Sequence, residues 1–164
     1  MNVINQATEY LYIVSNPTPT KARKQIIQVK WVPPGHGSFK LNTDGVVKDN
    51  PGDGCLWGVI RNHKGDWIIG LISKEANTTP FLVELNALRQ GLAMASSNNL
   101  VPLEINLDSQ EVVTMFHEET ALYKKLIYEC GSLMEKLNAA PPIHVYREQN
   151  RVANLISKEG LKRG

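Results

Sequence analysis

The chain lacks the features of secreted and membrane-spanning proteins. It has only two cysteines, Cys55 and Cys130, which lie far apart and form no CxxC motif. We therefore expect free thiols in a reducing compartment, and neither a disulfide framework nor a zinc site. No apolar run approaches the roughly 20 residues of a membrane span, and the N-terminus carries no secretory signal pattern. These absences predict an intracellular protein, nuclear or cytoplasmic, without a membrane partner.

A strong charge of either sign is also missing. The 18 lysines and arginines stand against 16 aspartates and glutamates, which gives a formal net charge of +2. Such a balance does not indicate a nucleic-acid partner by itself, and it is too low for a disordered polyelectrolyte. With 164 residues, 42% of them hydrophobic, the chain can bury a core of its own. We expect one globular domain that is a monomer.

The first thirty residues differ from the rest of the chain. Residues 1–14 place apolar side chains at helical spacing, which predicts a short amphipathic helix. The apolar positions in this pattern are Ile4, Ala7, Leu11 and Val14. The next segment, SNPTPTKARKQ, combines prolines, threonines and basic residues and is typical of a linker. We therefore divide the chain into an N-terminal arm, residues 1–30, and a domain, residues 31–164.

Alternating apolar and polar residues open the domain. After the extended stretch WVPPGHG, a strand is predicted from Ser38 to Val46. The turn cluster NPGDG leads to a second strand, CLWGVIRN, and NHKG connects it to a third, DWIIGLISKE. Because three successive strands joined by short turns must be antiparallel, these segments predict an antiparallel meander.

The periodicity changes at Thr79, where the longest predicted helix begins. Its apolar stripe consists of Leu82, Leu85, Leu88, Leu92 and Ala95. A short strand ending in Asp108 follows, and then a helix for which Ser109 is a natural N-cap. A further helix over Leu122–Leu137, a strand over PPIHVYRE and a terminal helix over NRVANLISKEGLKRG complete the order β-β-β-α-β-α-α-β-α. This order predicts an α/β fold with a mixed sheet flanked by helices.

Three acidic residues lie near the positions where α/β sheets usually have their binding and active sites. Asp44 and Asp108 lie at the carboxyl ends of the first and fourth predicted strands, the ends at which such sheets bind ligands. Glu84 lies about one turn into the long helix, in an otherwise apolar stretch. An unpaired glutamate beside a core is costly, so we expect Glu84 either to face water or to point at something positive.

Each acid also has a purely structural interpretation. Asp44 can be a turn former, Asp108 a helix cap, and Glu84 the partner of Arg89. Taken together, a strand aspartate, a helix glutamate and a second strand aspartate are harder to obtain by accident. Three converging carboxylates repel one another, and a hard divalent cation with oxygen ligands offsets that repulsion.

These residues belong to segments that resemble a known family. KLNTDGVVKDNPGDGCLWGVIRNHKGDW, TTPFLVELNALRQGL, INLDSQEVV and HVYREQNRVANLISKEG are similar to the successive motifs of the ribonuclease H type 1 domain. They resemble most the retroelement-derived versions found in plants, where a WxPP lead-in precedes KLNxDG. The resemblance covers about Trp31 to Gly160. It implies the RNase H-like fold, a five-stranded mixed sheet of three antiparallel and then two parallel strands.

The resemblance also implies a metal site. Asp44, Glu84 and Asp108 match three acids of a cluster that binds two Mg²⁺ ions, for which Mn²⁺ can substitute. The fourth acid of the family belongs to an N-x-x-x-D pattern, which here reads NRVAN. Asn154 therefore stands where an aspartate is expected, and its amide keeps a carbonyl oxygen but removes one negative charge. We expect weaker metal binding at that position and slower cleavage.

The implied activity is cleavage of the RNA strand of RNA/DNA hybrids, held through backbone and 2′-hydroxyl contacts. The positions expected to contact substrate are Asn50, Gly52, Thr78, Thr79, Asn86 and Asn150. The resemblance offers His144 a role in product release, but its place in the last predicted strand favours a structural role, and Arg147 and Glu148 lie nearer the site. Two alternatives remain: a domain that binds nucleic acid after its catalysis has decayed at Asn154, and an interaction domain that no longer meets nucleic acid.

Overall fold

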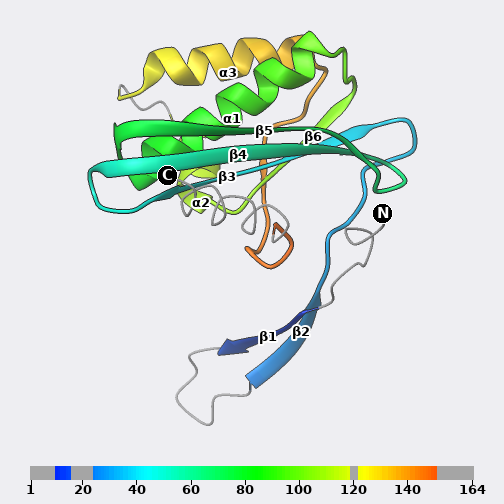
Figure 1. The fold of residues 1–164 in the computed structure, drawn as a ribbon. Helices are drawn as coiled ribbons and strands as arrows, with labels where there is room; N and C mark the ends of the chain where they lie inside the picture. The colour runs from blue at the N-terminus through cyan, green and yellow to red at the C-terminus, as the bar shows by residue number, and fades with distance from the viewer. Residues whose placement is uncertain (1–9, 16–23, 119–121, 151–164) are drawn as a thin grey trace.

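The computed structural model describes residues 10–15, 24–118 and 122–150. A five-stranded sheet in the order β5-β4-β3-β6-β7 forms the body of the molecule (Figure 1). Its strands are β3 (Phe39–Val47), β4 (Gly52–Asn62), β5 (Trp67–Thr78), β6 (Leu103–Leu107) and β7 (Ile143–His144). β3, β4 and β5 pair antiparallel, whereas β6 runs parallel to both β3 and β7. The predicted fold class is therefore confirmed.

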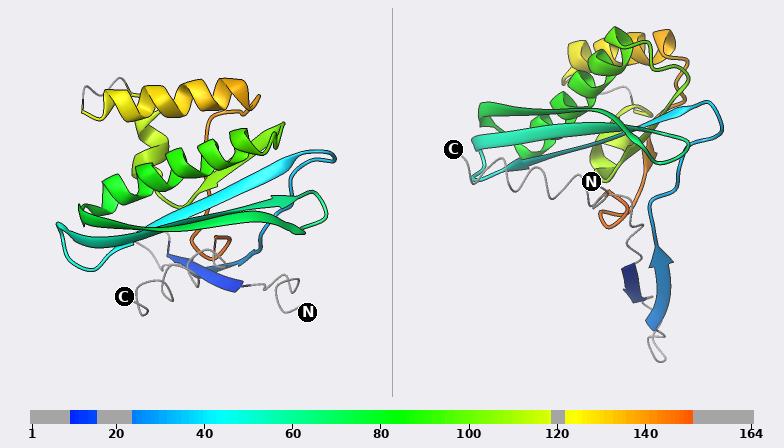
Figure 2. Two further views of the ribbon diagram at one scale, coloured as in Figure 1. Left: turned by 45° about the horizontal axis from the view of Figure 1, so that its top comes forward. Right: turned by 45° about the vertical axis from the view of Figure 1, so that its right-hand side comes forward.

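Helices α1 (Pro80–Ser97) and α3 (Lys124–Lys136) lie over the same face of the sheet (Figure 2). Short helix α2 (Gln110–Met115) follows β6. Thr79 caps α1 by accepting a hydrogen bond from the Leu82 amide, and Ser109 caps α2 in the same way. Among the residues that the structure describes, no helix combines the length and hydrophobicity that a membrane span requires.

The core fills the space between the sheet and these helices. Its largest fully buried side chains include Leu41 and Ile60 from the sheet and Leu85, Leu88 and Leu92 from α1. The three leucines of α1 belong to the predicted apolar stripe, so the helical periodicity placed the buried face of this helix correctly. Cys55 and Cys130 are both buried free thiols, as predicted.

The N-terminal helix prediction is wrong over the described residues. Tyr10–Ser15 forms strand β1, which pairs antiparallel with β2 (Lys24–Val29). The sequence YLYIVS is rich in aromatic and β-branched residues, which fit a strand better than a helix. The end of the predicted linker is also part of β2, while residues 16–23 and 1–9 lie outside the described residues. The division between arm and domain at residue 30 stays a prediction.

The last strand is shorter than predicted. PPIHVYRE pairs with β6 only at Ile143 and His144. Prolines at positions 141 and 142 have no N–H to donate to a ladder, and the chain turns after Val145, where the Gln149 amide bonds to the Tyr146 carbonyl. The predicted terminal helix, including Asn154, lies outside the described residues.

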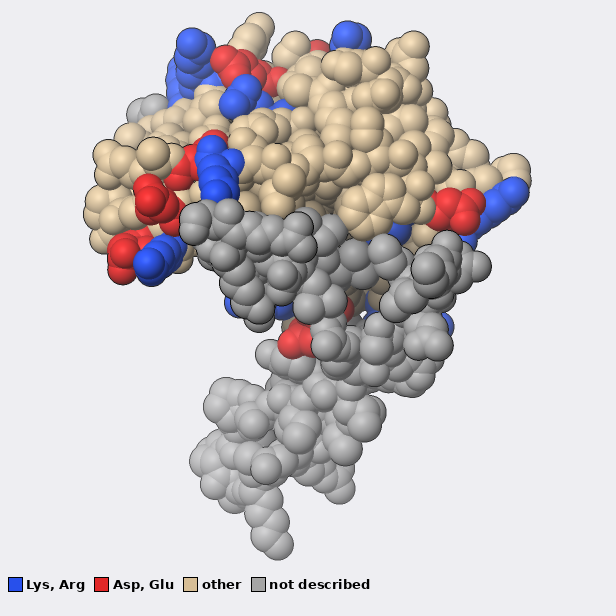
Figure 3. Space-filling view, viewed as in Figure 1, with Lys and Arg blue, Asp and Glu red and all other residues tan. Residues whose placement is uncertain are grey.

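Surface charge is mixed on the face seen in Figure 3, where basic and acidic side chains stand next to one another. This pattern agrees with the small formal net charge of +2.

Gly45 sets the distance between α1 and the middle of the sheet. A Cβ atom at this glycine would lie 2.7 Å from Cγ1 of Val83 and 3.0 Å from its backbone carbonyl carbon. The close approach matters for function because Gly45 follows Asp44 and Val83 precedes Glu84. Glycine at this position lets the two acidic side chains come together.

We predict that Gly45→Ala destabilises the protein by about 1–3 kcal/mol, because the added methyl group meets helix backbone that cannot move freely. Urea denaturation followed by circular dichroism measures the effect. Gly131→Ala is the matched control: nothing lies within 4 Å of a Cβ at that position of α3. It should be neutral or stabilising by up to about 1 kcal/mol. Equal stability changes in the two variants would contradict the prediction.

Candidate metal centre

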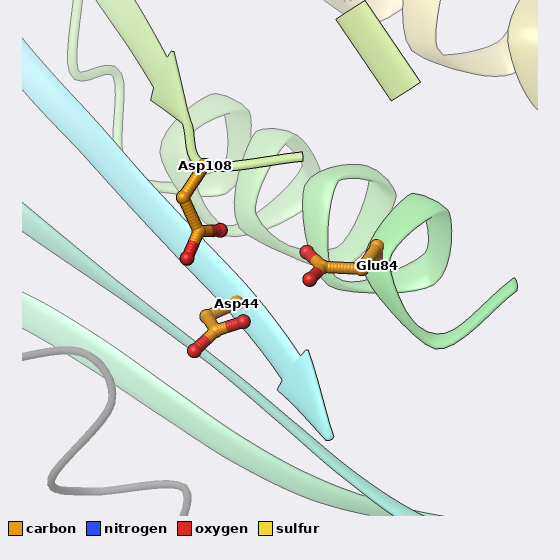
Figure 4. Close-up of side chains that lie close together, drawn as sticks. All are labelled: Asp44, Glu84 and Asp108. Carbon is orange, nitrogen blue, oxygen red and sulfur yellow. The ribbon is translucent and has the colours of Figure 1, made fainter. Parts of the chain in front are cut away.

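Three carboxylates from three elements lie close together above the sheet (Figure 4). Asp44 lies on β3, Asp108 directly follows β6, and Glu84 lies in the second turn of α1. One oxygen of each side chain lies within 4.8 Å of the others. The structure thus brings together the three acids that the sequence singled out.

The parallel register of β3 and β6 explains why the two aspartates are neighbours. Thr43 is paired with Leu107, and the pairing between these strands stops there. Asp44 and Asp108 are the next residues on each strand, so they flank the point where the ladder ends. β3 itself continues to Val47 because β4 remains paired with it. Asp44 is therefore fixed inside a strand rather than at its exit.

Burial leaves carboxylate oxygens without partners. Asp44 is fully buried, and the side chain of Asp108 is 1% exposed. The Gly45 amide donates to Oδ1 of Asp44 over 2.8 Å. In the described part of the chain, Oδ2 of Asp44 and Oδ1 of Asp108 have no hydrogen-bond partner. Buried acceptors of this kind normally find a donor or a cation, so two such oxygens facing one cluster indicate a binding position.

Burial and mutual repulsion disfavour the charged forms. Burial, reinforced by the charge of Asp108, raises the pKa of Asp44 from 3.8 to about 7. Burial and then the charges of both aspartates raise the pKa of Glu84 well above its ordinary value. Without a cation, burial and repulsion therefore favour the uncharged, protonated forms of Asp44 and Glu84.

Arg147 supplies positive charge to the cluster. Its Nε donates to Oδ2 of Asp108 over 3.4 Å, and its side chain is 72% exposed. Burial raises the pKa of Asp108, while the Arg147 charge and hydrogen bond lower it. The same charge also lowers the pKa of Asp44 and Glu84. Sequence reasoning placed Arg147 only near the site, and the ion pair makes it part of the site.

The donor set fits a hard divalent cation. It consists of carboxylate oxygens only, which suits Mg²⁺, Mn²⁺ or Ca²⁺ better than softer metals that favour nitrogen or sulfur. One guanidinium faces three acids, so a cation would offset the remaining repulsion. The unpartnered oxygens of Asp44 and Asp108 are available for it.

The other predicted site residues have varied surroundings. Thr79 is the N-cap of α1, and Thr78 is buried, so both contribute to the fold itself. The Asn86 amide donates to Oε2 of Glu75 over 3.2 Å. Asn50 is exposed in the turn before β4, and Gly52 begins that strand. His144 is exposed on β7.

Asn150 is buried beside the acids. Its Nδ2 donates to the Thr43 carbonyl over 2.8 Å, which fixes it to the residue before Asp44. Asn150 also lowers the pKa of Asp108. Its amide therefore fixes the chain beside the acids. Asn154, predicted to complete the site, lies outside the described residues.

Comparison with known proteins identifies the family. Residues 42–160 match the family model described as Reverse transcriptase-like. Since this match covers well over half of the chain, the protein belongs to the reverse transcriptase-like family, and its domain has the RNase H-like fold.

An Arabidopsis thaliana protein described as a "putative ribonuclease H protein" is 30% identical over 129 residues. The match covers 77% of this chain but only 21% of that relative, so the chain spans about one fifth of its length.

Solved structures show the same fold. RNase H1 from Halobacterium salinarum superposes with a TM-score of 0.72 at 21% identity, covering 77% of this chain and 99% of that one. The N-terminal RNase H domain of a Mycobacterium tuberculosis protein gives 0.70 at 18% identity, covering 77% and 94%. LC11-RNase H1, solved in complex with an RNA/DNA hybrid, gives 0.67 at 23% identity, covering 74% and 95%.

The raised pKa of Asp44 predicts how the metal-free protein responds to pH. The folded state holds the proton up to about pH 7, whereas the unfolded chain releases it near 3.8. Stability is therefore lost as the pH rises through this window, by on the order of 2–4 kcal/mol for this group.

Urea denaturation with a chelator at about pH 5 and about pH 8 measures this loss. Asp44→Asn should flatten the dependence, while Asp53→Asn, at an exposed position of β4, should not. An unchanged slope in Asp44→Asn would contradict the assignment.

Arg147→Gln should steepen the same pH dependence, because it removes the charge that lowers the pKa of all three acids. The variant should be less stable than the parent near neutral pH, with a smaller difference in mild acid. Lys64→Gln, which removes a charge from the exposed β4–β5 hairpin, is the control. The role of Arg147 fails if both variants follow the parent curve.

Proposed function

We propose that this domain hydrolyses the RNA strand of RNA/DNA hybrids with the help of divalent cations. The observation that carries the proposal is the convergence of Asp44, Glu84 and Asp108, with ligand oxygens within 4.8 Å of one another. Membership of the reverse transcriptase-like family supports it, as does a fold shared with proteins named RNase H1, one of them solved with a hybrid.

Two Mg²⁺ ions, or Mn²⁺ in their place, would occupy the site. Asp44, Glu84 and Asp108 would hold one ion, and Asp44 together with Asn154 would hold the other. Bound ions of this kind activate the attacking water and stabilise the leaving oxygen of a phosphodiester. The protein contributes a rigid carboxylate on β3, which both positions share, and the guanidinium of Arg147 beside Asp108.

Asn154 attenuates this activity. An amide oxygen can still bind a cation, but it carries no charge, and Mg²⁺ is dehydrated reluctantly. The ion position that depends on Asn154 should therefore need a higher metal concentration than the one formed by three carboxylates.

Substrate recognition would be independent of sequence. Backbone and side-chain donors at the rim of the site, such as Asn50, Gly52, Thr79 and Asn86, can contact phosphates and 2′-hydroxyls without reading bases. The mixed charge seen in Figure 3 favours modest affinity for the hybrid.

The loss of charge at Asn154 favours a second candidate, a domain that binds hybrids without cutting them. A paired assay separates the two. A labelled RNA/DNA duplex is incubated with Mg²⁺ or Mn²⁺ and with the parent protein or Asn154→Asp. We expect the parent to cut the RNA strand slowly and Asn154→Asp to cut it faster and at lower metal concentration.

Two variants control this assay. Asn138→Asp adds the same charge at an exposed position after α3 and should not change the rate. Asp44→Asn should abolish cutting by either form. If neither the parent nor Asn154→Asp cuts the RNA strand, the enzyme proposal is wrong. An inert parent with an active Asn154→Asp would establish the binding domain instead.

A further inference from the structure

Residues 30–32, where the predicted domain begins, are fixed to the sheet by polar contacts. The indole Nε1 of Trp31 donates to Oδ1 of Asn42 over 3.0 Å, and Nζ of Lys40 donates to the Val32 carbonyl over 2.8 Å. The guanidinium carbon of Arg61 lies 3.8 Å from the centre of the Trp31 ring. Residues 30–32 are therefore held by β3 and β4, and we call them the lead-in segment.

The sheet residues that hold the lead-in segment, Asn42 and Arg61, are buried, so moving them would cost free energy. Asn42 is fully buried and Arg61 is 7% exposed. Nη2 of Arg61 donates to the same Asn42 oxygen over 3.1 Å. Among the described residues, no carboxylate forms an ion pair with Arg61. The Trp31 ring and the Asn42 oxygen are thus the contacts that favour its charge, which ties the lead-in segment to the sheet.

The lead-in segment also contacts the chain near its other end. Nε2 of Gln149 donates to the Lys30 carbonyl over 2.9 Å, a contact between residues 119 positions apart. Oε1 of the same side chain accepts from the Tyr146 amide over 3.2 Å. Both ends of the Gln149 amide are therefore used, one within its own turn and one on the lead-in segment.

The turn over residues 146–150 carries two contacts of the acidic cluster. It holds Arg147 against Asp108 and Asn150 against the Thr43 carbonyl. Its own backbone bonds run from the Gln149 amide to the Tyr146 carbonyl and from the Asn150 amide to the Arg147 carbonyl. Gln149 lies between Arg147 and Asn150 in the sequence of this turn.

We propose that Gln149 is a positioning residue that sets the 146–150 turn against the lead-in segment and thereby holds Arg147 and Asn150 at the carboxylates. Trp31 acts through it, by fixing the Lys30 carbonyl that Gln149 binds. This contact between Gln149 and the Lys30 carbonyl, which we call the link, holds the 146–150 turn in place from outside the sheet. It rests on the proposed function only for its consequence in catalysis, because its geometry can be measured in the metal-free protein.

Amide hydrogen exchange in the full chain tests the link. Gln149→Met keeps the length of the side chain and removes both hydrogen bonds. Exchange at the amides of Gln149 and Asn150 should rise by about 3- to 10-fold, the factor given by one net hydrogen bond. Amides of α1 and β4 should keep their protection. Gln110→Met, which removes an exposed glutamine that donates to Thr114 of its own helix, is the control.

Two further measurements separate positioning from general loosening. The ¹H–¹⁵N signal of the Arg147 Nε–H should move in Gln149→Met and in Trp31→Ala, but not in Gln110→Met. Gln149→Met and Trp31→Ala should disturb the same contact, between Gln149 and the Lys30 carbonyl. In the variant that carries both substitutions, the increase in exchange should therefore be clearly smaller than the sum of the two single effects. Trp31→Phe, which keeps a ring beside Arg61, should recover much of the parent behaviour.

Unchanged exchange at the turn in Gln149→Met, or fully additive effects in the double variant, would overturn the proposal. Failure of the hybrid cleavage assay would not, because none of these signals depends on turnover. If the link holds and the domain is active, Gln149→Met should also reduce the cleavage rate without changing the apparent affinity for the hybrid.

Discussion

Parallel pairing of β3 with β6 is the constraint on which the site depends. The register ends at Thr43 and Leu107, so the next residue of each strand, an aspartate, lies where the two strands separate. α1 packs above this point, and the small Gly45 lets it approach closely enough to add Glu84. The sheet and the helix packed on it thus position all three carboxylates, which suits a centre that would hold a small cation in a fixed geometry.

This rigidity has an electrostatic cost. Three carboxylates are confined near one another with little water, and the pKa values of all three rise because burial disfavours their charged forms. A purely structural cluster would be expected to satisfy its oxygens internally, yet Oδ2 of Asp44 and Oδ1 of Asp108 remain without partners in the described part of the chain. Repulsion that the fold leaves uncompensated is what a binding site for a cation requires.

Periodicity in the sequence was sufficient to predict most of the fold. Alternation located β3, β4 and β5, and the leucine stripe located α1 and its buried face. The three acids could be grouped because their places near predicted strand ends and a helix start are local features that topology then brings together, although Asp44 lies inside β3 and not at its exit. The order of strands and helices, added to the resemblance, fixed that topology.

Contacts between distant segments were out of reach of this reasoning. The pairing of β1 with β2 was missed because helical spacing over 1–14 competed with strand-forming residues, and only a partner strand decides between them. Nothing in the local pattern around Gln149 indicates the Lys30 carbonyl, 119 residues away. The ion pair of Arg147 with Asp108 also joins residues that are distant in the sequence, and no local pattern indicates it. The sequence therefore indicated the three acids of the cluster, and not the contacts that hold the chain around them.

Counting charges shows why Arg147 and Asn154 must be considered together. Asp44, Glu84 and Asp108 contribute three negative charges when ionised, and Arg147 returns one positive charge. The remaining two negative charges match a single divalent cation. An aspartate in place of Asn154 would leave three, enough to attract a second cation before substrate arrives. If Asn154 takes the fourth position as proposed, the second ion would draw its negative charge from the phosphate of a bound strand, which Mg²⁺ sites commonly use. Metal occupancy and hybrid binding would then be coupled.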